Sequence, residues 1–175
     1  EYLDPVFAGT LKATDISFTY PGEDYPIIQN FSLTLKRGQK AALIGPSGAG
    51  KSTILQLILG DLKPNTGTVT LDKINVLSLQ KERSKLFSVL NQEPFLFNTT
   101  IYENLKMANP DATADQMMEI LEKVQLADFI NSLPKKLNTE VAEAGARFSG
   151  GQKERLALAR VLLQDTPIVL LDEPT

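Results

Sequence analysis

The residues whose types and spacing most clearly suggest a chemical role lie between Gly45 and Ser52, where the sequence reads GPSGAGKS. Glycines at this spacing let successive backbone N–H groups surround phosphate oxygens without obstruction by Cβ atoms, and a following helix adds a favourable dipole. In the pattern G-x-x-x-x-G-K-[ST], the ammonium of Lys51 can neutralise the β- and γ-phosphates and the Ser52 hydroxyl can ligate Mg²⁺. The alternative is a glycine-rich turn that only caps a helix. A strand expected before the loop and a helix expected after it favour phosphate binding.

The run IVLLDE, from Ile168 to Glu173, predicts a buried strand that ends in two acidic residues. Buried strands commonly end in one aspartate, so the run alone does not show whether these acidic residues have a catalytic role or simply end a strand. With a phosphate loop in the same chain, Asp172 can hold Mg²⁺ through water and Glu173 can polarise an attacking water. Two adjacent carboxylates at the end of an apolar strand are costly unless a cation is near.

A third element is FSGGQKERLALAR, from Phe148 to Arg160. Ser149 and Gln152 fit the S-x-x-Q capping box, which satisfies backbone groups at a helix start. Anion binding uses the same exposed N–H groups, so a Ser-Gly-Gly start is also a possible phosphate receptor. The residues alone leave both interpretations open.

The elements that must position these residues alternate between strand and helix. Residues 10–35 predict two antiparallel strands joined by the turn-rich PGEDYP, and KAALIG, which ends at Gly45, predicts a strand buried on both faces. Residues 52–62 predict a helix ended by Pro64-Asn65. Further strands are expected at GTVTLDK, LFSVL and IVLLD, and helices within 101–133 and 152–164.

Composition excludes several kinds of chemistry. The 175 residues include no Cys, His or Trp, which rules out disulfides, Cys/His zinc sites and imidazole catalysis within this chain. Eighteen Lys and Arg against 21 Asp and Glu give a net charge of −3, and no basic cluster suits a nucleic-acid surface. The apolar runs are shorter than the roughly 18–20 residues of a membrane span, and EYLDPVFAGT lacks the basic region of a signal peptide.

Taken together, these motifs resemble the nucleotide-binding domain of ATP-binding-cassette (ABC) transporters. The resemblance covers essentially the whole chain, and the loop at Ser149 is similar to the family signature LSGGQ, with Phe148 in place of Leu. It implies an α/β fold: a P-loop NTPase core with an N-terminal antiparallel β unit and a helical signature subdomain. The expected single domain, 1–175, has a core of 10–91 and 166–175 and a helical subdomain of about 98–164.

Two further residues resemble family positions. Tyr20, 25 positions before Gly45, is similar to the aromatic residue that stacks on adenine, although an ordinary strand aromatic is the alternative. Gln92 in VLNQEPFLF resembles the Q-loop glutamine, which senses Mg²⁺ and the attacking water. The resemblance implies catalytic roles for Lys51, Gln92 and Glu173, and Mg²⁺ ligation by Ser52, Gln92 and Asp172. The implied ATP-binding residues are Tyr20, Gly45, Pro46, Ser47, Gly48, Ala49, Gly50, Lys51, Ser52, Thr53, Ser149, Gly150, Gly151 and Gln152.

The family resemblance also implies partners. Two nucleotide-binding domains bind head to tail, as a homodimer or heterodimer, so Ser149, Gly151 and Gln152 are expected to serve a nucleotide held mainly by the partner. Two segments resemble loops of export-type ABC proteins: QEPFLFNTTIYENL and TEVAEAG. In those proteins the loops touch the transmembrane domain at the cytoplasmic face of the cell membrane. TEVAEAG differs from the usual TEVGERG because it lacks the Arg. EAGARFSGGQKERLALAR is similar to bacterial subunits of the heterodimeric thiol-exporter class linked to cytochrome bd assembly. The transported substrate is not readable from these residues.

The implied function is ATP hydrolysis that powers transport across a membrane in an exporter-like ABC transporter. Two alternatives stay open: a soluble ABC-type ATPase of DNA repair or translation, and a non-hydrolysing regulatory nucleotide-binding module. The sequence stops at DEPT, before the family's D-loop and switch histidine. We therefore expect a C-terminally incomplete domain that binds MgATP weakly and hydrolyses it very slowly by itself.

Overall fold

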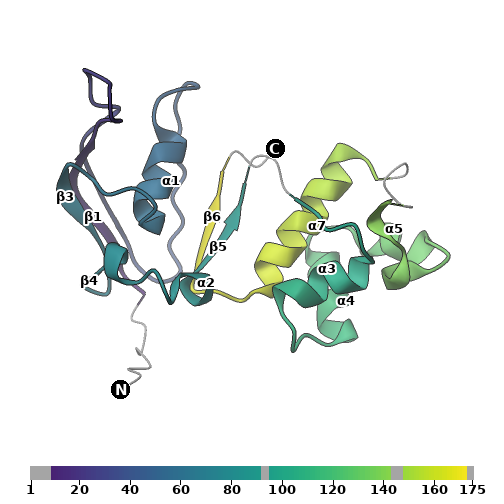
Figure 1. The fold of residues 1–175 in the computed structure, drawn as a ribbon. Helices are drawn as coiled ribbons and strands as arrows, with labels where there is room; N and C mark the ends of the chain where they lie inside the picture. The colour runs from purple at the N-terminus through teal and green to yellow at the C-terminus, as the bar shows by residue number, and fades with distance from the viewer. Residues whose placement is uncertain (1–8, 92–94, 143–147, 173–175) are drawn as a thin grey trace. The chain divides into compact units, whose positions relative to one another are not determined.

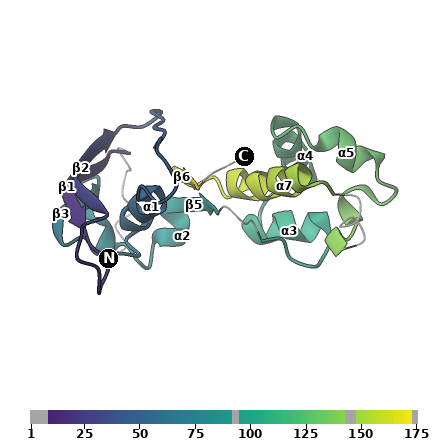
Figure 2. The ribbon, with the colours of Figure 1, turned by 90° about the horizontal axis from the view of Figure 1, so that it is seen from above.

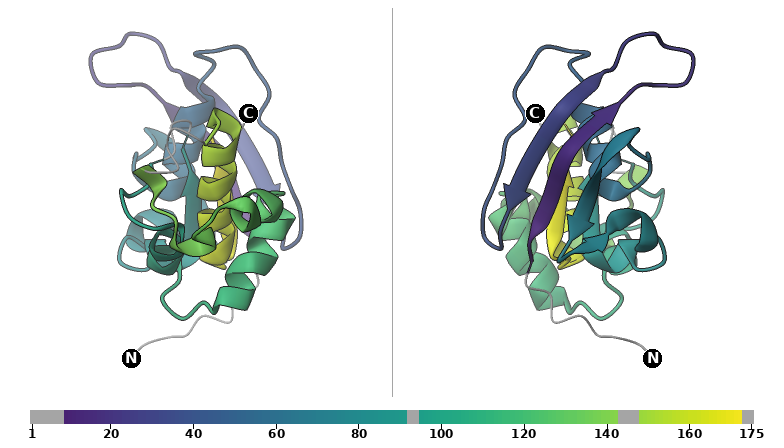
Figure 3. Two further views of the ribbon diagram at one scale, coloured as in Figure 1. Left: turned by 90° about the vertical axis from the view of Figure 1, so that its right-hand side faces the viewer. Right: turned by 90° about the vertical axis from the view of Figure 1, so that its left-hand side faces the viewer.

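The computed structural model describes residues 9–91, 95–142 and 148–172, and the chain forms two compact units, Glu1–Arg83 and Ser84–Thr175 (Figure 1). The first unit contains an antiparallel sheet in the order β2-β1-β3-β4. Its strands are β1 (Leu11–Phe18), β2 (Ile28–Leu35), β3 (Thr66–Leu71) and β4 (Ile74–Asn75), and a 3-10 turn, η1 (Val76–Ser78), follows. Figure 3 shows β1 and β2 side by side. The two antiparallel strands predicted within 10–35 are confirmed.

A β-bulge in β1 keeps its apolar residues on one face. Leu11 and Ala13 are buried, and the register with β2 then shifts before Ile16, which is also buried. Asp15 occupies the extra position with a left-handed φ of 47°, and its backbone N–H donates to the Ser32 hydroxyl over 2.9 Å. The bulge therefore changes the side-chain alternation from odd to even positions without turning the strand over.

Helix α1 (Lys51–Leu59) lies alongside this sheet in Figure 1 and buries Ile54, Leu57 and Ile58. Gly60 ends the helix in a left-handed conformation, φ 75°, and its N–H donates to backbone carbonyls of the last turn. The predicted end near Pro64-Asn65 is therefore wrong, because a C-terminal glycine stops the helix one turn earlier.

The strand predicted at 40–45 is also wrong. Residues 39–46 have no strand conformation, and the Ile44 residue is 95% exposed. A strand needs a hydrogen-bonded neighbour, and the described sheet of the first unit includes none of these residues. Apolar composition alone is therefore insufficient to form a ladder here.

The second unit contains strands β5 (Phe87–Leu90) and β6 (Ile168–Leu171) at two positions where the sequence predicts strands, and the two pair in parallel. The expectation that the strand from Ile168 is buried is wrong: Val169 and Leu171 are 41% and 40% exposed, and only Leu170 is buried. Phe87 is paired with Ile168 and Leu90 with Leu171. A short helix, α2 (Arg83–Leu86), leads into β5.

The rest of the second unit is helical. It comprises α3 (Ile101–Ala108), α4 (Ala114–Lys123), α5 (Ala127–Ser132), the 3-10 turn η2 (Lys136–Asn138) and α7 (Gly150–Leu163). Helix α7 packs along both α3 and α4 (Figure 2). Their shared core includes the fully buried Ile101, Leu105, Met117, Leu121 and Leu156. None of the helices in the described parts of the chain is long and apolar enough to span a membrane.

Candidate functional site

The glycine-rich loop of the first unit leads directly into α1. Gly48 and Gly50 have left-handed φ values of 80° and 88°, a conformation that side chains with a Cβ rarely adopt. Gly50 is the N-cap of α1 and has no side chain that could cap the helix. A Cβ at Gly50 would lie 2.6 Å from Ile28 Cδ1, whereas one at Gly48 would meet nothing within 4 Å. The loop therefore has a backbone conformation that favours glycine at both positions.

Lys51 lies against this loop. Its Nζ donates to the carbonyl oxygens of Gly45, at 2.8 Å, and Pro46, at 2.9 Å. The ammonium is thus held over the loop by two backbone acceptors. A phosphate group that entered the loop would meet this positive charge together with the dipole of α1.

Tyr20 also lies beside α1. Its hydroxyl is 2.9 Å from Thr53 Oγ1, and its ring packs edge-on against Phe18 with centroids 5.0 Å apart. Thr53 is buried, while Tyr20 is 38% exposed. The hydrogen bond and the ring contact fix the aromatic side chain and leave part of it open to solvent. Sequence reasoning named both residues, but it did not foresee their contact.

In the second unit, Ser149 is the N-cap of α7. Its Oγ accepts from the Gln152 N–H over 3.2 Å, and Gln152 Oε1 accepts from the Ser149 N–H over 2.8 Å. The predicted capping box is therefore confirmed. Gly150 and Gly151 form the first two positions of the helix, and a Cβ at either would meet nothing within 4 Å. Phe148 is buried and packs edge-on against Phe129, so the aromatic residue in place of Leu serves as a core side chain.

Asp172 directly follows β6. Its backbone N–H donates to Leu90 O over 2.9 Å, which joins it to the end of β5. Because β5 and β6 are parallel, Asn91 and Asp172, which directly follow the two strands, lie at the same edge of the pair. Gln92 and Glu173, the predicted Q-loop glutamine and general base, lie outside the described residues.

The predicted metal ligands fit Mg²⁺ by their donor chemistry. A hydroxyl from Ser52 and a carboxylate from Asp172 are hard oxygen donors, and Mg²⁺ in phosphate sites takes one or two protein ligands together with phosphate oxygens and water. The described residues contain no cluster of three or more His, Cys, Asp or Glu that could hold a metal by themselves.

Sequence reasoning missed two polar residues that hold the loop at 95–97. Asn104 is fully buried in α3, and Arg160 in α7 donates to Phe95 O over 2.7 Å. The signal for Asn104 was present, because it lies three residues after Ile101 and beside Leu105 on the buried face of its helix.

Comparison with known proteins decides the family. The family model described as "ABC transporter" matches residues 28–175. The chain belongs to the ABC transporter family. The predicted fold is confirmed by a solved structure, a bacterial Atm1-family ABC exporter with ATP bound, with a TM-score of 0.84 and 34% identity over 95% of this chain and 29% of the exporter chain.

Two curated relatives indicate the kind of ABC protein that this chain resembles. The glutathione/L-cysteine transport system ATP-binding/permease protein CydD of Bacillus subtilis is 47% identical over 95% of this chain and 29% of its own length. The mitochondrial iron-sulfur clusters transporter ATM1 of Kluyveromyces lactis is 43% identical over 94% of this chain and 23% of its own length. The chain thus spans less than a third of these ABC proteins.

Proposed function

We propose that this ABC chain binds and hydrolyses ATP and thereby powers transport across a membrane in an exporter-like transporter. The observation that carries the proposal is the loop at 45–52, with two left-handed glycines, the helix start of α1 and the Lys51 ammonium on one short segment. The similarity to an exporter with ATP bound supports the same assignment.

Residue roles follow from the chemistry of each side chain. Lys51 would exchange its loop carbonyls for phosphate oxygens, and Tyr20, anchored through Thr53, would pack against the adenine ring. Ser52, Gln92 and Asp172 would hold Mg²⁺, which would neutralise developing charge on the phosphates. Glu173 would accept a proton from the attacking water.

The proposed partners are a second nucleotide-binding domain and a transmembrane domain at the cytoplasmic face of the membrane. The N–H groups at the start of α7 would receive the phosphates of a nucleotide bound mainly by the second domain. The exposed position of Gly150 and Gly151 supports this role, because a molecule can approach both glycines closely. The relatives named as ATP-binding/permease protein and as transporter support the membrane partner.

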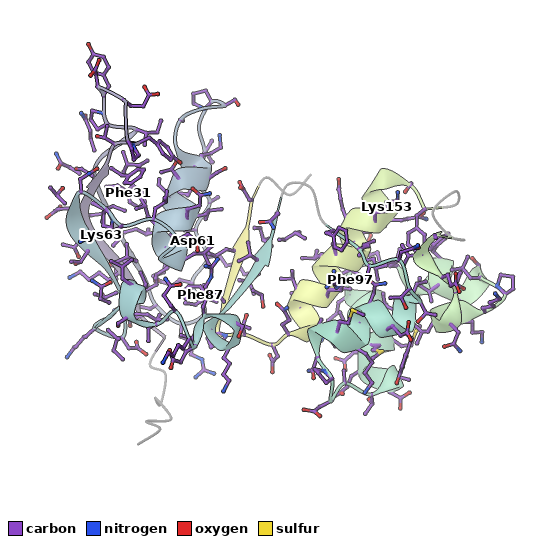
Figure 4. All side chains as sticks on the ribbon, in the orientation of Figure 1. Phe31, Asp61, Lys63, Phe87, Phe97 and Lys153 are labelled. Atoms are coloured by element: carbon purple, nitrogen blue, oxygen red, sulfur yellow. The ribbon has the colours of Figure 1, made fainter. Side chains whose placement is uncertain are left out.

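The test is MgATP binding and steady-state hydrolysis by the purified full-length protein. We expect Lys51→Ala to lower MgATP affinity about tenfold or more, because a charged hydrogen-bond donor is removed from the phosphates. Glu173→Gln is expected to retain ATP binding and lose hydrolysis. Lys63→Ala is the matched control, since Lys63 is an exposed lysine of the first unit outside the loop (Figure 4).

Robust turnover that Lys51→Ala leaves unchanged would contradict the site assignment. Equal loss of binding and hydrolysis in Glu173→Gln would contradict its role as the base.

A further inference from the structure

The loop at 95–97 in the second unit presents two aromatic rings at the surface while its middle residue is anchored. Phe95 is 70% exposed and Phe97 is 39% exposed, and their rings pack edge-on with centroids 5.1 Å apart. Leu96, between them, packs against two groups of buried apolar residues, one that includes Ile101 and Leu105 and one formed by Leu90, Ala157 and Val161. Fixing the backbone of a surface loop costs conformational entropy, so contacts with the buried part of the protein must offset that cost.

Asn104 supplies one of these supports. Its Oδ1 accepts from the Phe97 N–H over 2.9 Å, and its Nδ2 donates to Phe97 O at 2.9 Å and Thr100 O at 3.0 Å. The side chain is fully buried and makes three hydrogen bonds to backbone. Asn104 therefore ties the loop to α3.

Arg160 supplies the second support, from α7. Its Nη1 donates to Phe95 O over 2.7 Å, and its guanidinium carbon lies 5.1 Å from the centroid of the Phe97 ring. Figure 4 shows Phe97 beside α7. Burial lowers the pKa of the Arg160 guanidinium, and its Nε is buried with no hydrogen-bond partner among the described residues. A partly desolvated cation is costly, so the carbonyl and the ring must offset that cost for this rotamer to persist.

Arg160 shares its helix with the Ser149 cap. Gly150 and Arg160 are about 15 Å apart along α7, at 1.5 Å per residue, and the helix is continuous between them. The same helix packs Ala157 and Val161 against Leu90, the last residue of β5. A displacement at the start of α7 therefore moves the group that holds Phe95 and Phe97.

We propose that Arg160 is a positioning residue that transmits movement of the Ser149 end of α7 to the loop at 95–97 when ATP is engaged. The inference rests on the proposed function, because it requires that the start of α7 meets a nucleotide. The inference adds a specific mechanical link. The Arg160 guanidinium fixes the Phe95 and Phe97 rings to α7, so these rings change position when nucleotide binding moves α7. Asn104 ties the other side of the loop to α3, so the loop responds to displacement of α7 relative to α3.

The test is hydrogen–deuterium exchange of the full-length protein with and without MgATP, followed in a peptide that covers 95–100 and one that covers 149–155. In the wild-type protein we expect MgATP to slow exchange in both peptides. Arg160→Ala and Arg160→Met are expected to keep the response at 149–155, to lose it at 95–100 and to raise basal exchange there about tenfold, as expected for loss of one charged hydrogen bond. The KM for ATP should stay within about twofold, because Arg160 is not among the residues proposed to bind ATP.

Arg155→Ala is the matched control. Arg155 is exposed on the same helix and donates to a different backbone carbonyl, Gln125 O, over 3.2 Å. It should leave the response at 95–100 intact, and Arg160→Lys should restore part of that response because an ammonium can still donate to Phe95 O. Arg160→Met keeps the packing of the aliphatic part of the side chain and removes only the guanidinium, so this variant is expected to fold.

The outcomes separate the inference from the proposed function. If both peptides of Arg160→Met respond as in the wild type, the positioning role is refuted while ATP engagement stands. If Arg155→Ala abolishes the loop response as completely as Arg160→Met does, the specific link through Arg160 is also refuted. If MgATP changes neither peptide in the wild-type protein, the proposed nucleotide engagement fails and this inference fails with it.

Discussion

Gly50→Ala tests whether the loop at 45–52 depends on a glycine for steric as well as conformational reasons. The new Cβ would occupy a residue with φ 88° and lie 2.6 Å from Ile28 Cδ1 and 3.3 Å from Ile27 O. The left-handed conformation costs about 1–2 kcal/mol for a residue with a Cβ, and overpacking beside the buried Ile28 adds about 1–3 kcal/mol. We expect the free energy of unfolding to fall by about 2–5 kcal/mol.

Gly48→Ala is the matched control because Gly48 has φ 80° with nothing within 4 Å of an added Cβ. It should show the conformational cost alone, about 1–2 kcal/mol. Urea unfolding of the purified protein without nucleotide, monitored by circular dichroism, measures both variants. Equal losses in the two variants would refute the steric part of the reasoning.

A double-mutant cycle isolates the contact with Ile28. Ile28→Val removes Cδ1 and should cost about 0.5–1.5 kcal/mol in the wild-type background. In the Gly50→Ala background the same change relieves the close approach, so the cost should shrink or reverse in sign. Additivity within about 0.5 kcal/mol would show that the two side chains do not compete for this space.

The remaining predictions each change one contact of the site or its support. Tyr20→Phe removes the bond to Thr53 but keeps the ring, so we expect a loss of about 1 kcal/mol in unfolding free energy and nearly unchanged ATP affinity by calorimetry; a tenfold weaker affinity would contradict a stacking role. Asn104→Ala should lower the unfolding free energy by about 2–4 kcal/mol in urea melts, because buried backbone groups lose their partner, and a change below about 1 kcal/mol would speak against that support. Gly151→Ala should keep or raise the unfolding midpoint and reduce ATP turnover of the full-length protein, whereas a fall in both would point to a role in folding.

Elements with both a periodic pattern and a local partner could be predicted from the sequence. The strands β1 and β2 are close neighbours along the chain, and the caps of α7 come from residues three positions apart. Their hydrogen bonds are therefore determined locally. The segment at 40–45 has no such partner among the described residues of its unit, and its apolar pattern did not suffice to make a strand.

The details that the sequence did not indicate depend on long-range packing. Asp15 adopts a left-handed φ because a bulge brings Ile16 back to the buried face, which requires the register of β2. Arg160 is 65 positions from Phe95, so no local pattern relates the guanidinium to the carbonyl that it binds. An arginine on a helix is ordinarily interpreted as a solvated charge, and only the folded contact distinguishes this one.

The start of α7 shows why a structural and a functional interpretation of the same residues need not compete. The capping box uses the Ser149 hydroxyl to accept from Gln152 and the Gln152 side chain to accept from Ser149. Between them lie Gly150 and Gly151, whose N–H groups occupy the first turn, where a helix supplies no backbone acceptor. Because neither glycine has a side chain and a Cβ at either would meet nothing within 4 Å, an anion could approach these groups without displacing the cap. The cap then orients the helix end in advance, so that binding an anion requires little further ordering of this chain.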